Sequence, residues 1–167
     1  MRHLAIPALF SALLAPALPA LAQDQTAAAE QRAVVFDVEL YDTSGEGSNP
    51  ALEKRIDLVS DELRRLIDAS PKYAAVDLAP EAEHIASLGP LYKCNGCERD
   101  VAKALDGDVS FIAVVHKIST LILKIQIVGQ NVATGEVFTM AGADIRGDND
   151  ESWLHGVRWL ARNKLDL

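Results

Sequence analysis

Residues 109–145 decide the fold, and they read VSFIAVVHKISTLILKIQIVGQNVATGEVFTMAGADI. Two long runs rich in β-branched residues, 109–118 and 121–132, have the composition of buried strands. Residues 133–136, Ala-Thr-Gly-Glu, are typical of a turn, and a third strand follows over about 137–145. The segment therefore predicts an antiparallel meander of three strands.

Upstream of the meander, residues 33–41 alternate apolar and polar side chains, which is the period of a half-buried strand. This alternation places Phe36, Val38 and Leu40 on one face. A loop over 42–49 should follow, because it contains two glycines and few apolar residues.

Helices are expected on both sides of a further short strand. The clearest begins at Asn49-Pro50, an N-cap followed by a proline at the first helical position, and stops at Ser70-Pro71. The remaining elements are a strand over 73–78 and helices over 80–88, 98–105 and 151–164. The order β-α-β-α-α-β-β-β-α predicts a single α/β (α+β) domain, a mixed sheet with helices packed on it.

The start of the chain has the pattern of a cleavable secretory signal over residues 1–22. Arg2 and His3 precede an apolar run, and Ala20-Leu21-Ala22 provides the small residues of a cleavage site. We expect residues 23–32 to be a flexible leader and 33–167 to form one domain, periplasmic or secreted, with no membrane span in the mature chain.

The acidic balance of the chain limits its partners. The formal net charge is −8 at pH 7. Such a domain repels phosphate backbones and anionic lipid surfaces, which argues against nucleic acid and membrane-surface partners. It is compatible with a cationic protein partner.

The chain contains two cysteines, Cys94 and Cys97. In an exported chain the first interpretation is a structural disulfide that fixes the start of the following helix. A thiol-disulfide exchange site is the alternative, because a helix start stabilises a thiolate. Metal binding is a third, with His84, His116 and His155 as the nitrogen donors available in the mature chain.

The loop after the first strand is a candidate contact for a ligand or partner, because a strand there meets a helix. Its polar side chains are those of Asp42, Thr43, Ser44 and Glu46. The lysine and glycine spacing of a phosphate loop is absent. A solvated connector is the alternative interpretation.

A second charged stretch lies around the start of the last helix and suggests a calcium or lanthanide site; it contains Asp144, Arg146, Asp148, Asp150 and Glu151. It does not have the glycine and glutamate positions of an EF-hand, so we expect no metal there. Asp148 followed by Glu151 predicts a capping box for the last helix instead.

The last helix supplies three further candidate contacts for a partner, Trp153, Arg158 and Arg162. Trp153 and Trp159 are six residues apart and so lie on different faces. An exposed tryptophan would suit a docking surface. The alternative is that both tryptophans fill the core. Trp153 also belongs to an apolar stripe with Leu154, Val157 and Leu160, which we expect to be buried.

Segments 35–44, 94–97 and 144–165 resemble a family of small secreted bacterial proteins known only as a domain of unknown function. The architecture is also similar to the amino-terminal domain of TolB and to the curli secretion protein CsgG. The family resemblance implies an accessory role beside alcohol dehydrogenases that use pyrroloquinoline quinone, in methylotroph-like bacteria.

The sequence therefore favours an exported accessory or binding protein that acts through a periplasmic protein partner, rather than an enzyme. The histidines lack a partnered serine that would indicate a hydrolase triad, and we expect no cofactor. A thiol-disulfide protein using Cys94 and Cys97, and a subunit of an envelope-assembly complex, are the alternatives. The oligomeric state stays open.

Overall fold

A computed structural model describes residues 30–165 and 167 of the chain, so the predicted signal lies outside the described residues. The strands are β1 Gln31–Val35, β2 Glu39–Asp42, β3 Tyr73–Ala75, β4 Val109–Lys117, β5 Leu123–Asn131 and β6 Val137–Ile145. The α-helices are α1 Pro50–Asp68, α2 Ala82–Ser87, α3 Cys97–Ala104 and α4 Asp150–Asn163. Among the described helices, none is both long enough and apolar enough to cross a bilayer.

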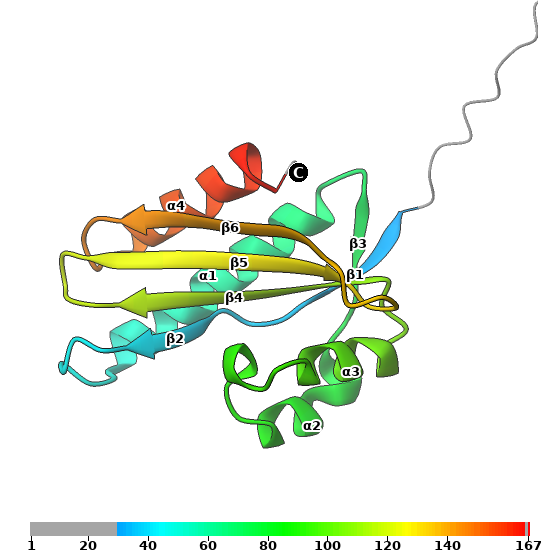
Figure 1. The fold of residues 1–167 in the computed structure, drawn as a ribbon. Coiled ribbons are helices and arrows are strands. Elements are labelled where there is room, and N and C mark those ends of the chain that lie inside the picture. Colours follow the sequence, from blue (N-terminus) through cyan, green and yellow to red (C-terminus); the bar gives the residue numbers. More distant parts are fainter. Residues whose placement is uncertain (1–29, 166) are drawn as a thin grey trace, which may run out of the picture.

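The strands form one mixed sheet in the order β3-β1-β4-β5-β6 (Figure 1). β1 runs parallel to β3 and β4, and β2 continues the line of β1 as a second parallel neighbour of β4. β4, β5 and β6 form the antiparallel meander that the sequence predicts. The predicted fold class, a mixed sheet with helices packed on it, is confirmed.

The predicted first strand is two strands, β1 and β2, separated at residues 36–38. The shared face expected for Phe36 and Val38 is wrong, because Phe36 packs with the helices α2 and α3, whereas Val38 packs in the core under α1. The last three residues of β1 are buried on both faces of the sheet, so their side chains do not alternate between core and solvent. It also begins at Gln31, two residues before the predicted start of the domain.

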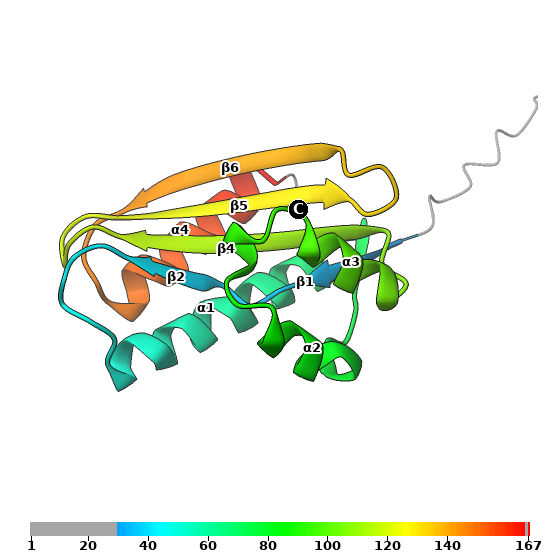
Figure 2. The same cartoon turned by 60° about the horizontal axis from the view of Figure 1, so that its bottom comes forward.

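Helices α1 and α4 cover one face of the sheet, and α2 and α3 cover part of the other (Figure 2). The main core lies under α1 and α4 and includes Trp153, Leu63 and Phe111. A smaller core lies under α2 and α3 and includes Val34, Phe36 and Val101.

Helix α4 lies very close to the sheet. A Cβ on Gly156 would lie 3.1 Å from Cγ1 of Ile145, so glycine allows this close approach. Of the predicted apolar stripe, Trp153, Val157 and Leu160 are fully buried, whereas Leu154 is partly buried. Helix α1 starts at the predicted N-cap, because the side chain of Asn49 accepts a bond from the N–H of Leu52 at 3.0 Å.

Candidate functional site

Three loops meet at one end of the sheet, at the left of Figure 1. They are residues 43–49 between β2 and α1, 118–122 between β4 and β5, and 146–149 between β6 and α4. We call this region the loop end. β2 and β4 are parallel, so both present their carboxyl ends here, the customary place for a binding site in such a sheet.

The predicted contact residues of the first loop mostly bond to the protein itself. The carboxylate of Asp42 accepts bonds from the N–H and the hydroxyl of Ser44, at 2.8 and 2.6 Å. These two bonds, and the charge of Lys117, lower the pKa of Asp42. Thr43 Oγ1 lies 2.8 Å from Nε2 of His116. The first residues of the loop are therefore bonded to the protein, while residues 45–49 are exposed to solvent.

A buried lysine joins the first and third loops. Lys117 is 1% exposed, and its Nζ lies 2.9 Å from a carboxylate oxygen of Glu46 and 3.0 Å from one of Asp148. The bond with Glu46 raises the pKa of Lys117, and Asp148 adds to this effect, while burial opposes it. Arg55 of α1 bonds to Asp148 as well, and its Nε lies 2.8 Å from Asp150. These five charged residues form what we call the ion cluster.

The predicted capping box of Asp148 and Glu151 is wrong. The N-cap of α4 is Asn149, whose side chain accepts a bond from the N–H of Ser152 at 2.9 Å. Asp148 lies one residue earlier, where its carboxylate reaches Lys117 and Arg55. Without the carboxylate of Asp148, the two cations Lys117 and Arg55 would lose a partner in a partly dehydrated site, which is costly. The helix start does not require a carboxylate, because asparagine caps a helix equally well.

The turn between β4 and β5 exposes three large aliphatic side chains. Ile118, Leu121 and Ile122 are 46%, 72% and 58% exposed, and we call them the apolar tip. The turn itself is ordered, because Ser119 Oγ accepts bonds from the N–H groups of Leu121 and Ile122 at 3.2 and 3.1 Å. The two β-branched runs predicted strands for Ile118, Leu121 and Ile122, so the tip was not expected from the sequence. Ser119-Thr120 between two aliphatic runs was the signal that could have shown it.

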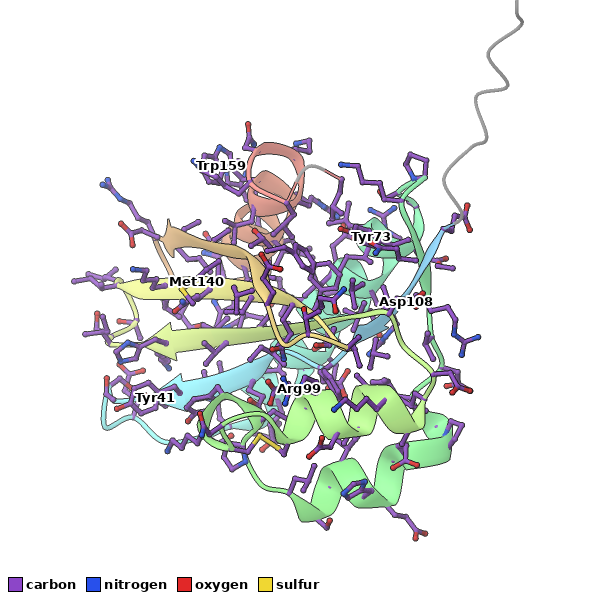
Figure 3. All side chains as sticks on the ribbon, turned by 45° about the vertical axis from the view of Figure 1, so that its right-hand side comes forward. Tyr41, Tyr73, Arg99, Asp108, Met140 and Trp159 are labelled. Carbon is purple, nitrogen blue, oxygen red and sulfur yellow. A yellow bond between two sulfur atoms is a disulfide. The ribbon has the colours of Figure 1, made fainter. Side chains whose placement is uncertain are left out.

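An aromatic cluster lies on the sheet face next to the loop end. Tyr41 stacks on His116 with ring centroids 4.6 Å apart, and Tyr92 lies 5.9 Å from Tyr41. Lys93 Nζ lies over both tyrosine rings, at 5.5 and 5.2 Å from their centroids. Figure 3 labels Tyr41, which stands near the end of β2. Glu39 holds Tyr92 in place by accepting a bond from its N–H at 2.9 Å.

Cys94 and Cys97 form the predicted disulfide, immediately before and at the start of α3. Cys94 Sγ lies 3.4 Å from a carboxylate oxygen of Glu98, a buried residue whose other oxygen accepts a 2.6 Å bond from Gln130. A carboxylate at this position disfavours a thiolate on Cys94. With the two sulfurs bonded to each other, neither is a free thiolate ligand for a metal.

The predicted contacts on α4 differ in their exposure. Trp153 is fully buried in the main core, so the expectation that it reaches a partner is wrong, and Trp159 is the exposed tryptophan. Arg158 Nε lies 2.6 Å from Glu62 on α1 and so joins the two helices. Arg162 is exposed. Among the predicted contacts on α4, Arg162 thus offers its side chain to solvent with the fewest internal contacts.

Similar solved structures share this fold. An NMR structure of E. coli LpoB matches with a TM-score of 0.50 and 15% identity, over 86% of this chain and 85% of that chain. A PelC dodecamer from Paraburkholderia phytofirmans matches with a TM-score of 0.50 and 10% identity, over 79% and 85%. TolB from Acinetobacter baumannii matches more weakly, with a TM-score of 0.43 and 5% identity over 80% of this chain and 28% of that chain. These likenesses concern the fold alone.

The sequence comparisons assign a family. No curated protein matches the chain. The model of the family DUF3280, whose description reads “Protein of unknown function (DUF2380)”, matches residues 31–165. This range covers both cores, the disulfide and the loop end. The resemblance to a domain of unknown function, inferred from the sequence, is therefore confirmed. This chain belongs to the DUF3280 family.

Proposed function

We propose that this chain is an exported, non-enzymatic binding domain that acts through a protein partner, with the apolar tip as its contact. The exposure of Ile118, Leu121 and Ile122 on one ordered turn carries the proposal. Exposed apolar side chains that stand together mark interaction sites, and each contributes about 1.5 to 3 kcal/mol when it is fully buried.

The ion cluster fixes the position of the turn that carries the apolar tip. Lys117 directly precedes Ile118, and the N–H of Asp148 bonds to the carbonyl of Thr120 within the turn at 2.9 Å. The carboxylate of the same Asp148 bonds to Lys117. The turn is therefore held at two points before any partner arrives, and a preorganised contact loses less conformational entropy on binding.

Charge and chemistry favour a protein over a lipid surface as the occupant. The net charge of −8 disfavours approach to anionic lipid.

Export is supported by the pattern of residues 1–22 and by the disulfide, since such bonds persist in oxidising compartments.

Three more specific roles are proposals with unequal support. A role in an assembly complex is supported by the likeness to PelC, which is described as a dodecamer. A quinoprotein alcohol dehydrogenase as partner rests on the resemblance inferred from the sequence, and none of the similar structures bears on it. A thiol-disulfide role is disfavoured by the carboxylate of Glu98 beside Cys94.

Affinity capture from the exported fraction tests the proposal. The mature chain, residues 23–167, should retain a dominant partner, and Leu121→Ser with Ile122→Ser should weaken that complex at least tenfold because it removes apolar burial. Leu58→Ser is the matched control, since Leu58 is an exposed aliphatic residue on α1, away from the loop end. Circular dichroism should show equal folding of all variants.

Equal capture by the wild type and the tip variant would remove the apolar tip as the contact. Equal loss of capture in the Leu58→Ser control would show that the complex depends on non-specific binding to exposed aliphatic residues, which would contradict a specific contact at the tip. Purified quinoprotein alcohol dehydrogenase, titrated against the mature chain, tests the finer partner directly.

A further inference from the structure

Strand β6 forms a free border of the sheet. It is the last strand in the order β3-β1-β4-β5-β6, and within residues 30–165 and 167 it pairs with β5 alone. Figure 2 shows β6 along the upper border, with no further strand beyond it. Along its nine residues, the N–H and C=O groups that point away from β5 have no strand partner in the described part of the chain.

This border has one feature that keeps sheet edges apart, a bulge at Phe138 near its start, and lacks most of the others. β6 reads VFTMAGADI, which contains no proline and no lysine. Its one charged residue, Asp144, stands near the end and lies opposite Lys124 of β5. Met140, in the middle of the strand, is 65% exposed and is labelled in Figure 3. Such a long, weakly charged edge is suited to pairing with another strand.

We propose that β6 pairs with β6 of a second copy of this chain, antiparallel and around a two-fold axis, so that two sheets join into one. The opposite border is a poor alternative partner, because its edge strands β3 and β2 have three and four residues, and each would leave most of β6 unpaired. A head-to-tail ring through these two edges is therefore disfavoured, whereas β6 matches itself in length.

The position of Asp144 selects the antiparallel arrangement. In a parallel pair the two Asp144 carboxylates would lie side by side, and like charges opposite each other destabilise a strand pair. In an antiparallel pair centred on Ala141 they lie at opposite ends, roughly 20 Å apart at about 3.4 Å per residue. The border is thus compatible in charge with a second copy of itself.

Sedimentation of the mature chain between about 1 μM and 1 mM tests the proposal, and we expect a reversible monomer-dimer equilibrium. Met140→Lys should raise the dimer dissociation constant at least tenfold, because it places an ammonium from each copy near the centre of the pair. Gln126→Lys is the matched control: Gln126 lies on the same face but on β5, between two paired strands. It should leave the constant unchanged.

A second measurement does not depend on a variant. Amide hydrogen exchange in β6 should slow as protein concentration rises, while exchange in β3 should not change. A monomer at all concentrations, a ring larger than a dimer, or a dimer that Met140→Lys leaves intact would each overturn the proposal.

Discussion

On one face of the sheet, α1 and α4 bury large apolar side chains such as Trp153 and Leu63, whereas on the other face α2 and α3 cover only part of the strands. The second face is held by a smaller core and by the disulfide, and it leaves Tyr41 and Met140 exposed. The difference indicates that most of the stability resides in the first face and that surface for partners is available on the second.

The largest loss of unfolding free energy is expected from a substitution in the main core, on the face covered by α1 and α4. Trp153→Ala removes the largest fully buried side chain and should lower the free energy of unfolding by about 4 kcal/mol. Trp159→Ala, on the same helix but exposed, should cost at most about 0.5 kcal/mol. Urea unfolding measures both, and equal losses would contradict the division between a buried and an exposed tryptophan.

The next effect tests the ion cluster at the loop end. Asp148→Asn leaves Lys117 and Arg55 without their shared carboxylate and should cost about 3 to 4 kcal/mol, as expected when a buried pair loses one partner. Amide exchange in residues 118–122 should accelerate in the variant. Asp144→Asn, which changes an exposed carboxylate, is the control, and a similar loss there would contradict the special role of Asp148.

The contact between α1 and α4 should make stability depend on acid. Bonds first from Arg65 and then from Arg158 lower the pKa of Glu62 to about 2 from 4.5, while burial opposes them. A lowered pKa stabilises the fold above the unfolded-state value, and this contribution is lost as the pH falls from about 4.5 to about 2.

Glu62→Gln should therefore lower the free energy of unfolding at pH 7 by up to about 3 kcal/mol and flatten its dependence on pH in that window. Asp61→Asn, which changes an exposed neighbour, should leave the profile unchanged. A wild-type profile that is flat between pH 5 and pH 2 would contradict the assigned pairing.

The smallest effect belongs to the second face. Cys94→Ser with Cys97→Ser should cost about 2 kcal/mol, because the disulfide closes a very short loop. Partner capture through the apolar tip should persist. The reduction potential should lie well below that of catalytic disulfides, since Glu98 disfavours the thiolate. A potential near that of oxidising exchange proteins, together with trapped mixed disulfides, would contradict this.

The sequence could predict the elements that depend on local chemistry. The meander follows from β-branched runs around a Thr-Gly turn, and α1 follows from Asn49-Pro50 and its apolar period. The two cysteines could pair within the molecule only with each other, so their bond was also predictable. These features depend on neighbouring residues along the chain, which is why pattern and spacing reveal them.

Tertiary structure alone decided the ion cluster. Lys117 occupies an inward position in an otherwise apolar alternation, but its partners Glu46 and Asp148 come from loops far away in sequence. For the same reason Asp148 could not be assigned as an ion-pair partner instead of a cap. Local periodicity places a side chain on a face, whereas burial depends on what another part of the chain packs against that face.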